Sequence, residues 1–326
     1  AREEIAGAIG CHPSEVIFTS GGTEANNLAV LGLFEQRNQS DARPIVLSSP
    51  VEHHAVLDAL EHLEKKHSAH IVFVPIDGQG QLDLAWLDEF ITNEGHRVAL
   101  VTAIWANNET GVVIDIPRLV EICKRLQIPV HSDAVATVGH MAVDFRNSGL
   151  STLAFTGHKL GAPIGIGALL VGRGVKLQAQ FFGGSQERSL RAGTQNISGA
   201  QCLALATKLA CSELEANSLR WSSLRQLIVS RIKSEIPEAI FVADASNERQ
   251  DSSTSGSETQ LNNILNVIFP GCLGESLLFL LDQAGIAVSN GSACTAGVVG
   301  GSHVLLAMGF DSQLAASALR ISFGKD

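Results

Sequence analysis

Short apolar runs alternate with amphipathic helical stretches through the first half of the chain. The runs are rich in β-branched residues, as strands are, and the stretches between them repeat apolar residues at helical spacing. This alternation predicts parallel strands joined by crossover helices. The predicted strands are 15–19, 45–48, 71–76, 98–105 and 129–132, and the predicted helices are 24–36, 54–66, 84–92 and 116–126.

Several of these strands are apolar at consecutive positions, as in Val98–Thr102. Such runs are typical of a central sheet with helices on both faces. In sheets of this kind ligands bind beyond the carboxyl ends of the strands, so the polar residues after each strand are the first candidates for chemistry.

The pattern changes near residue 198, where a helical stretch begins and shorter strand-like and helix-like runs follow. We therefore expect a large domain, residues 1–215, and a smaller α+β C-terminal domain, residues 216–326. The polar stretch 245–260 is interpreted as a surface loop.

Composition limits the classes of protein that fit. The 326 residues are 45% apolar and 17% charged, as in ordinary globular proteins. The net charge of −10 argues against nucleic acid or anionic lipid as partners. Because no run reaches the roughly 20 apolar residues of a membrane helix and the start of the chain lacks a signal-peptide pattern, no membrane association and a cytoplasmic location are expected.

Metal and disulfide sites are not indicated. The six cysteines are scattered without paired spacing, which favours reduced thiols. His53 and His54 are adjacent, so their side chains point in different directions, and no Cys or His partner has suitable spacing; no metal is expected.

Two strand ends could hold an anion and a cationic ring. Thr19-Ser20-Gly21-Gly22-Thr23-Glu24 joins a strand to a helix, so backbone N–H groups can bind phosphate there, although an ordinary turn with Thr23 near the helix start is the alternative. Asp133 follows strand 129–132, where it could pair with a protonated heteroaromatic nitrogen or simply cap a helix.

Two nucleophiles stand out. Lys159, in Thr156-Gly157-His158-Lys159, lies between an apolar strand and a glycine-rich run, where it could form a Schiff base or be an ordinary surface lysine. Cys294 lies among small and flexible residues in 289–297, which suits an accessible thiol. The alternative is a buried, inert cysteine, as we expect for Cys123 and Cys202.

Six ordered segments resemble the cysteine desulfurases, a group of class V aminotransferases with the type I pyridoxal-phosphate fold. The resemblance extends from Glu15 almost to Lys325. It implies a mostly parallel α/β sheet with helices on both faces and a smaller C-terminal domain. The segments are Thr19–Glu24, Glu52–Val56, Ala106–Gly111, Gly157–Lys159, Gln186–Thr194 and Ser292–Thr295.

The resemblance implies roles for individual residues. Lys159 would hold pyridoxal 5'-phosphate as a Schiff base, Asp133 would meet the pyridine nitrogen, and His53 would stack on the ring as a catalytic residue. Asn108 would lie near the ring hydroxyl and the substrate. The phosphate would be bound by Gly22, Thr23, Thr156 and His158, and by Thr194 from the other subunit of a homodimer.

The implied reaction converts L-cysteine to L-alanine. Arg320 would bind the substrate carboxylate, for which a planar guanidinium is suited. Cys294 would take the substrate sulfur as a persulfide. The long cysteine loop is similar to the branch that passes persulfide to a scaffold or sulfur-carrier protein, for iron–sulfur cluster assembly or tRNA thiolation.

The sequence departs from the family in two ways. Ala136 stands where a glutamine usually contacts the ring oxygen, and both ends of the chain look truncated. Selenocysteine lyase, an aminotransferase and a non-catalytic scaffold remain as alternatives. The long cysteine loop favours sulfur over selenium, an aminotransferase would not need Cys294, and the presence of Lys159 and Cys294 argues against a scaffold.

Overall fold

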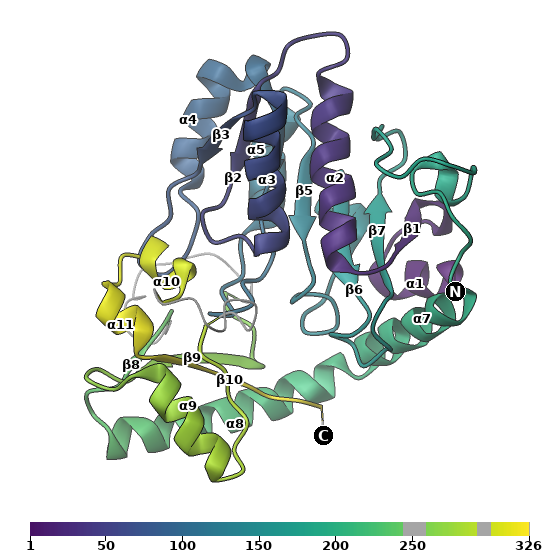
Figure 1. Cartoon of the computed structure of the whole chain (residues 1–326). Coiled ribbons are helices and arrows are strands. Elements are labelled where there is room, and N and C mark those ends of the chain that lie inside the picture. The colour runs from purple at the N-terminus through teal and green to yellow at the C-terminus, as the bar shows by residue number, and fades with distance from the viewer. Residues whose placement is uncertain (244–258, 292–300, 326) are drawn as a thin grey trace. The chain divides into compact units, whose positions relative to one another are not determined.

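The computed structural model describes residues 1–243, 259–291 and 301–325 (Figure 1). The chain divides into two compact units. The larger unit comprises Ala1–Pro75, Asp83–Trp105 and Ile114–Leu214, and the smaller comprises Ile76–Leu82, Ala106–Val113 and Glu215–Asp326. The smaller unit therefore takes two short segments from the first half of the chain, which the hydrophobic pattern does not separate from their neighbours.

A seven-stranded sheet forms the centre of the larger unit, in the order β1-β7-β6-β5-β4-β2-β3. The neighbouring strands from β3 to β6 pair in parallel. Only β7 is antiparallel to its neighbours, and because it is so to both β1 and β6, these two run in the same direction. The strands are β1 (Val16–Thr19), β2 (Ile45–Ser48), β3 (His70–Phe73), β4 (Val98–Thr102), β5 (Val130–Asp133), β6 (Thr152–Thr156) and β7 (Gly167–Val171).

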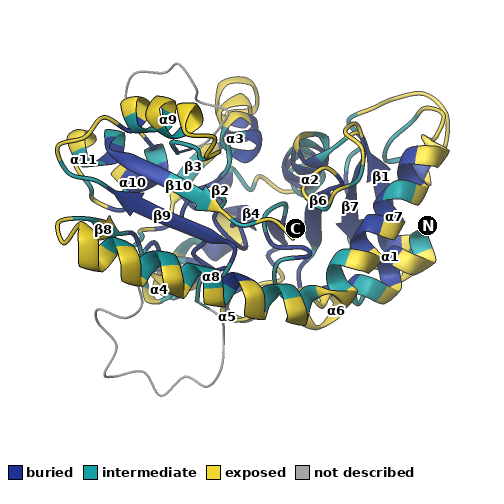
Figure 2. Cartoon of the chain, turned by 90° about the horizontal axis from the view of Figure 1, so that it is seen from below, coloured by how far each residue is buried: buried dark blue, intermediate teal, exposed yellow. Residues whose placement is uncertain are grey.

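Helices cover both faces of this sheet. In Figure 2, α2 and α3 lie on one side of the strands and α4, α5 and α6 on the other, which confirms the predicted fold class. The helices are α1 (Arg2–Ile9), α2 (Gly22–Arg37), α3 (His54–His67), α4 (Leu84–Glu94), α5 (Ile116–Lys124), α6 (Phe145–Ser148) and α7 (Ile197–Ser212), with the 3-10 turns η1 (Pro13–Glu15), η2 (Gly95–Arg97) and η3 (Glu187–Ser189).

The core of the larger unit lies where α2 and α3 pack on the sheet. Leu28 and Leu33 of α2 and Leu60 and Leu63 of α3 are buried against strand residues such as Leu169. Each such side chain contributes about 1.5–3 kcal/mol through burial. Every residue of β2, β4, β5, β6 and β7 is buried, as the consecutive apolar positions predict, whereas the edge strand β3 is partly exposed.

Helix α1 and strand β7 of this unit escape the sequence prediction, as does the four-residue helix α6. Helix α1 is short, but Ile5, Ala6 and Ile9 form a buried stripe, and the helix ends at Gly10 in the left-handed conformation. Strand β7 is the apolar run directly after the glycine-rich segment 161–167. It pairs antiparallel with β6 and completes the sheet beside β1.

The smaller unit is built on an antiparallel sheet in the order β10-β9-β8. Trp221 of α8 is buried, and its Nε1 donates to the Gly324 carbonyl at 2.8 Å. The short helices α10 and α11 were not predicted, because five residues give no clear periodicity. The elements are α8 (Leu214–Glu235), β8 (Ile240–Phe241), β9 (Ile264–Ile268), α9 (Gly274–Gln283), α10 (His303–Ala307), α11 (Ser312–Ala316) and β10 (Ala318–Ser322).

Candidate cofactor site and substrate residues

Three of the predicted strand ends meet at one edge of the large sheet. Because β1, β5 and β6 run in the same direction, their carboxyl ends lie together, as expected for a ligand site in such a sheet. Asp133 is the last residue of β5, and Thr156 is the last of β6, three residues before Lys159. The carboxyl ends of the strands therefore bring together the carboxyl of Asp133, the hydroxyl of Thr156 and the amine of Lys159.

The turn before α2 packs directly on this edge. Gly167 stands opposite Thr19 of β1 and opposite Thr156 of β6. A Cβ at Gly167 would lie 2.8 Å from the backbone of Gly21, and a Cβ at Gly22 would lie 2.6 Å from Val135 Cγ2. Both positions require glycine, because only then can the turn approach the strand ends so closely.

The start of α2 has donors available for an anion. The helix begins at Gly22, two residues before the predicted start, and its N-cap Gly21 provides no side chain to bond the first N–H groups. Glu24 accepts a hydrogen bond from Arg191 Nε at 2.8 Å. Burial alone would raise the pKa of Glu24, but hydrogen bonds from Arg191 and Ser20 lower it overall.

Asp133 is fully enclosed at the end of β5. Its side chain accepts hydrogen bonds from Asn26 Nδ2 at 2.6 Å and from the Val135 N–H at 2.9 Å. Burial raises the pKa of Asp133, and this outweighs the lowering by its hydrogen bonds and by the charge of His53. A carboxylate in this position is suited to a protonated ring nitrogen, whose charge would offset the cost of burial.

Behind Asp133 lies a buried chain of hydrogen bonds. Asn26 Oδ1 lies 3.0 Å from Nε2 of His131, and Nδ1 of His131 lies 2.9 Å from Thr152 Oγ1. Because Asn26 Nδ2 donates to Asp133, Asn26 Oδ1 must accept, so His131 carries its proton on Nε2. Burial lowers the pKa of His131 to about 3, which keeps this ring neutral.

A second carboxyl lies near Asp133. Burial raises the pKa of Glu52 well above its ordinary value, and the charge of Asp133 raises it further. Two neighbouring carboxyl groups do not both ionise easily. Glu52 is therefore the protonated member of the pair, and Asp133 is the one available as an anion.

His53 follows Glu52 and caps α3. Its Nδ1 accepts a hydrogen bond from the Ala55 N–H at 3.0 Å, which leaves the neutral ring's proton on Nε2. Electrostatic interaction with His53 lowers the pKa of Asp133, although burial outweighs it, so the two residues belong to one neighbourhood.

Lys159 and His158 are exposed at the end of β6. Thr156 Oγ1 lies 3.1 Å from Nδ1 of His158. Burial and then the charge of Lys159 lower the pKa of His158, and the same two causes act on His140. The charge of Lys159 therefore disfavours protonation of both imidazole rings.

The segment that carries Thr194 is anchored at one buried residue. Glu187 accepts hydrogen bonds from the Phe18 N–H at 2.8 Å and from Arg2 at 2.6 Å. Thr194 itself is exposed, as a residue that serves another subunit would be.

In the smaller unit, Asn108 and Arg320 lie together. Nη1 of Arg320 donates to the Asn108 backbone carbonyl at 3.0 Å, and Arg320 pairs through its backbone with Ser289. Glu109 is buried and accepts from Ser302 Oγ. A Cβ at Gly291 would lie 3.4 Å from Glu109 Oε2, so the described residues on both sides of the Cys294 segment are held at Glu109.

Cys294 lies outside the described residues, so its predicted exposure stays a prediction. Of the other cysteines, Cys123 is buried as expected, and burial raises its pKa to about 12. Cys202 is only half-buried, which corrects the expectation of full burial. Cys272 is exposed and free.

Sequence reasoning missed Asn26 and His131. A signal was present for each: His131 and Asp133 are two residues apart in a strand and therefore face the same side. Asn26 is a polar residue next to Ala25 on the face of α2 that also carries the buried Leu28 and Ala29. Polar groups on an apolar face require buried partners.

Neither a metal site nor a membrane helix is found in the described parts of the chain. No cluster of three or more His, Cys, Asp or Glu side chains could hold a metal ion there. No described helix is long and apolar enough to cross a membrane. The donor set instead fits pyridoxal phosphate: free N–H groups for a phosphate, a buried carboxylate for the ring nitrogen, and a lysine amine for the carbonyl.

The chain is similar to known proteins over almost its whole length. The chain is 41% identical over 325 residues to an IscS-like cysteine desulfurase of Mycobacterium tuberculosis, covering 99% of this chain and 80% of that protein. It is 37% identical over 323 residues to a cysteine desulfurase of Sinorhizobium fredii, covering 99% and 79%.

Solved structures show the same likeness. A NifS-like protein superposes with a TM-score of 0.85 at 31% identity, covering 99% of this chain and 80% of the other. DndA from Streptomyces lividans superposes with a TM-score of 0.81 at 29% identity, covering 98% and 86%. The sequence profile of the class-V aminotransferases matches residues 1–326, and the chain belongs to this family.

Proposed function

We propose that the chain is a pyridoxal 5'-phosphate-dependent cysteine desulfurase that converts L-cysteine to L-alanine and carries the sulfur as a persulfide on Cys294. The observation that carries this proposal is the strand edge where Asp133, Thr156 and Lys159 meet, in a chain 41% identical to an IscS-like cysteine desulfurase. Family membership itself implies dependence on pyridoxal phosphate.

The larger unit provides the groups that would hold the cofactor. The first turn of α2, with Gly22 and Thr23, would bind the phosphate together with Thr156 and His158. Asp133 would bind the protonated ring nitrogen, and His53 would lie against the ring face. Lys159 would hold the carbonyl carbon covalently through Nζ.

When bound, the cofactor would accept the electron pair from the substrate Cα. The amine of Lys159 would serve as the base that takes the proton from the substrate Cα. Asn26 and Val135 keep the Asp133 carboxylate turned toward one position throughout, since their hydrogen bonds fix both of its oxygens. His131 holds the Asn26 amide in the required orientation without gaining charge.

The smaller unit provides the groups for the substrate. Arg320, positioned by the carbonyl of Asn108, would bind the α-carboxylate, and Asn108 would line the substrate and ring hydroxyl. Cys294 thiolate would attack the substrate Sγ: the S–S bond would form, the Cβ–Sγ bond would break, and the electron pair of the broken bond would be protonated at Cβ. Return of the electron pair and of the proton from Lys159 Nζ to Cα would complete alanine.

A homodimer is part of the proposal. Several large apolar side chains of the larger unit are exposed, among them Ile164 at 86%, Phe182 at 83% and Ile197 at 75%. A second copy would cover such residues and bring Thr194 to the partner's phosphate. The persulfide acceptor would be an iron–sulfur scaffold or a sulfur-carrier protein, with tRNA thiolation as one use.

Borohydride reduction followed by peptide mass spectrometry tests the cofactor's position, because it would fix the cofactor on Lys159 in the wild type. Lys159→Ala should lose the adduct, and Lys176→Ala, an exposed lysine elsewhere, should keep it. Alanine and sulfide release should stop in Cys294→Ala but continue in Cys272→Ala. An adduct on another lysine would refute the assignment, and sulfide release by Cys294→Ala would refute the persulfide.

A further inference from the structure

A cavity of about 750 Å³ opens at the opposite edge of the large sheet, where β5 and β6 begin. It lies wholly in the larger unit, between the ends of α2 and α5 and the segment after β7. Its walls include the apolar Leu33, Ile128 and Val130, and its volume is in the range of small-molecule sites. The proposed desulfurase reaction does not use this cavity.

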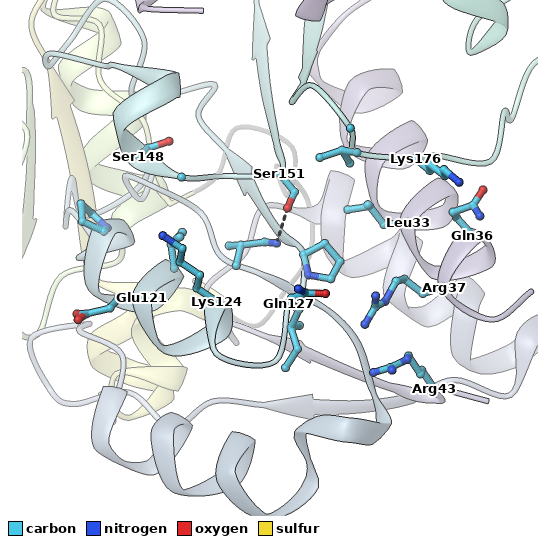
Figure 3. Close-up of a pocket in the computed structure, with 18 of the residues that line it drawn as sticks. Leu33, Gln36, Arg37, Arg43, Glu121, Lys124, Gln127, Ser148, Ser151 and Lys176 are labelled. Atoms are coloured by element: carbon cyan, nitrogen blue, oxygen red, sulfur yellow. Dashed lines mark hydrogen bonds between the residues drawn. The ribbon is translucent and has the colours of Figure 1, made fainter. Parts of the chain in front are cut away.

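Four cations line the cavity: Arg37, Arg43, Lys124 and Lys176. In the described part of the chain, none of these side chains forms an ion pair or hydrogen bond, whereas most other arginines do. Figure 3 shows Arg37 and Arg43 on one side of the cavity and Lys124 on the other. This concentration is unusual in a chain of net charge −10.

The two arginines are held near each other despite their equal charge. Asn38 Oδ1 accepts from the Arg43 N–H at 2.8 Å and Asn38 Nδ2 donates to the Arg43 carbonyl at 3.1 Å, which fixes the loop after α2. Burial and then the charge of Arg43 lower the pKa of Arg37. An anion between the two guanidinium groups would remove this repulsion.

The acidic residues of the cavity do not neutralise the four cations. Glu121 points away from the centre in Figure 3 and pairs with Arg118 at 2.6 Å. Asp41 is exposed. The helix dipole would favour Arg37 and Lys124, which end α2 and α5, but it gives no reason for Arg43 and Lys176, which lie in loops.

Gln127 adds a neutral donor at the centre of the cavity. It has a left-handed backbone with φ 52° in the turn three residues after the end of α5, a conformation that favours glycine. Keeping a side chain there costs about 1 kcal/mol. The amide that this side chain provides is suited to a phosphate or to a polar group of a larger ligand.

We propose that this cavity binds a small organic molecule that carries two or more phosphate groups. The cations would bind the phosphates, and the wall formed by Leu33, Ile128 and Val130 would contact the organic part. The proposal is independent of the desulfurase reaction, because no residue of the cavity belongs to the candidate cofactor or substrate residues.

Calorimetric titration of the cofactor-loaded protein with ADP tests the proposal, since bound cofactor fills the phosphate position at α2. We expect ADP to bind the wild type, and Arg37→Gln/Arg43→Gln to weaken it at least tenfold. The matched control Lys65→Gln/Arg231→Gln also removes two positive charges and should bind as the wild type does.

A second variant, Lys124→Gln/Lys176→Gln, is used if the arginine variant folds poorly, because both lysine side chains are exposed. It too should weaken ADP binding at least tenfold. Absence of ADP binding to the wild type, or equal binding by the cavity variants and the control, would overturn the proposal. Neither result depends on cysteine turnover, so the desulfurase proposal would be unaffected.

Discussion

Asn26 is the residue at which the buried hydrogen-bond chain is most easily broken. Replacing it by leucine keeps its approximate size but removes the N–H that donates to Asp133 and the oxygen that accepts from His131. A hydrogen bond to a charged group is worth about 1.5–3 kcal/mol, and an unsatisfied buried N–H costs about 1–3 kcal/mol. We therefore expect Asn26→Leu to lower the free energy of unfolding by about 3–5 kcal/mol.

A surface pair provides the matched control. Asn147 Nδ2 donates to Asp144 Oδ2 at 2.7 Å, nearly the same distance as from Asn26 to Asp133, but at an exposed position. Asn147→Leu should change the free energy of unfolding by less than about 0.5 kcal/mol. Urea unfolding of both variants measures the difference, and equal effects would show that burial does not strengthen the Asn26 bond.

The double variant Asn26→Leu/His131→Leu tests whether the chain acts as a unit. Once Asn26 is gone, Nε2 of His131 has lost its partner, so removing the ring also removes an unsatisfied N–H. The combined loss should be smaller than the sum of the two single losses by about 0.5–3 kcal/mol. Strict additivity would refute the coupling.

The same variants test the positioning of Asp133. If Asn26 holds the carboxylate for the ring nitrogen, Asn26→Leu should weaken pyridoxal phosphate about tenfold in a spectroscopic titration, equivalent to about 1.4 kcal/mol. Asn147→Leu should leave this affinity unchanged. Unchanged affinity in Asn26→Leu, in protein that is still folded, would show that Asp133 needs no support from α2.

Three further predictions follow from the described contacts. Gly167→Ala should lower cofactor affinity at least tenfold in the same titration, because its Cβ would lie 2.8 Å from Gly21, whereas Gly7→Ala, with no atom within 4 Å of the added Cβ, should not. Since the pKa of His131 is about 3 when folded and 6.5 when unfolded, the unfolded chain binds the proton first, and the free energy of unfolding should fall as the pH drops from 6.5 toward 3; urea titrations across this range should show a shallower fall in His131→Gln. Arg320→Lys should raise the KM for cysteine about tenfold with a smaller effect on cofactor affinity, because an ammonium cannot reproduce the bidentate contact; an equal KM in steady-state assays would argue against this role.

The sequence pattern predicts the strands well because most of them are buried on both faces. The ends of β2 coincide with the prediction, and α3 and α5 begin where expected. The predicted strands 71–76 and 98–105 are longer than β3 and β4, which end at Phe73 and Thr102. Beyond these ends single N–H groups, those of Val74, Ala103 and Trp105, still donate to the neighbouring strands, so the pattern does not mark where the regular strand stops.

The candidate catalytic and binding residues were predicted from the sequence, but the residues that hydrogen-bond to them were not. Asp133 and Lys159 are adjacent to glycine-rich or strand-end signals, whereas Asn26 acts through residues more than 100 positions away, at His131 and Asp133. Long-range partners of this kind leave no local pattern. They follow only from the strand order, which places β5 beneath α2.

The smaller unit depends on a segment from the first half of the chain. Asn266 Nδ2 donates to the Glu109 carbonyl at 3.2 Å, and the Leu261 N–H donates to the Gly111 carbonyl at 2.7 Å. Gly111 must be glycine, since its φ is 77° and a Cβ would lie 3.2 Å from Ile264. Residues 106–113 are therefore hydrogen-bonded to β9 and to the residues that lead into it. Changes in this segment should act on Arg320, whose guanidinium it positions, rather than on the strand β4 that precedes it in sequence.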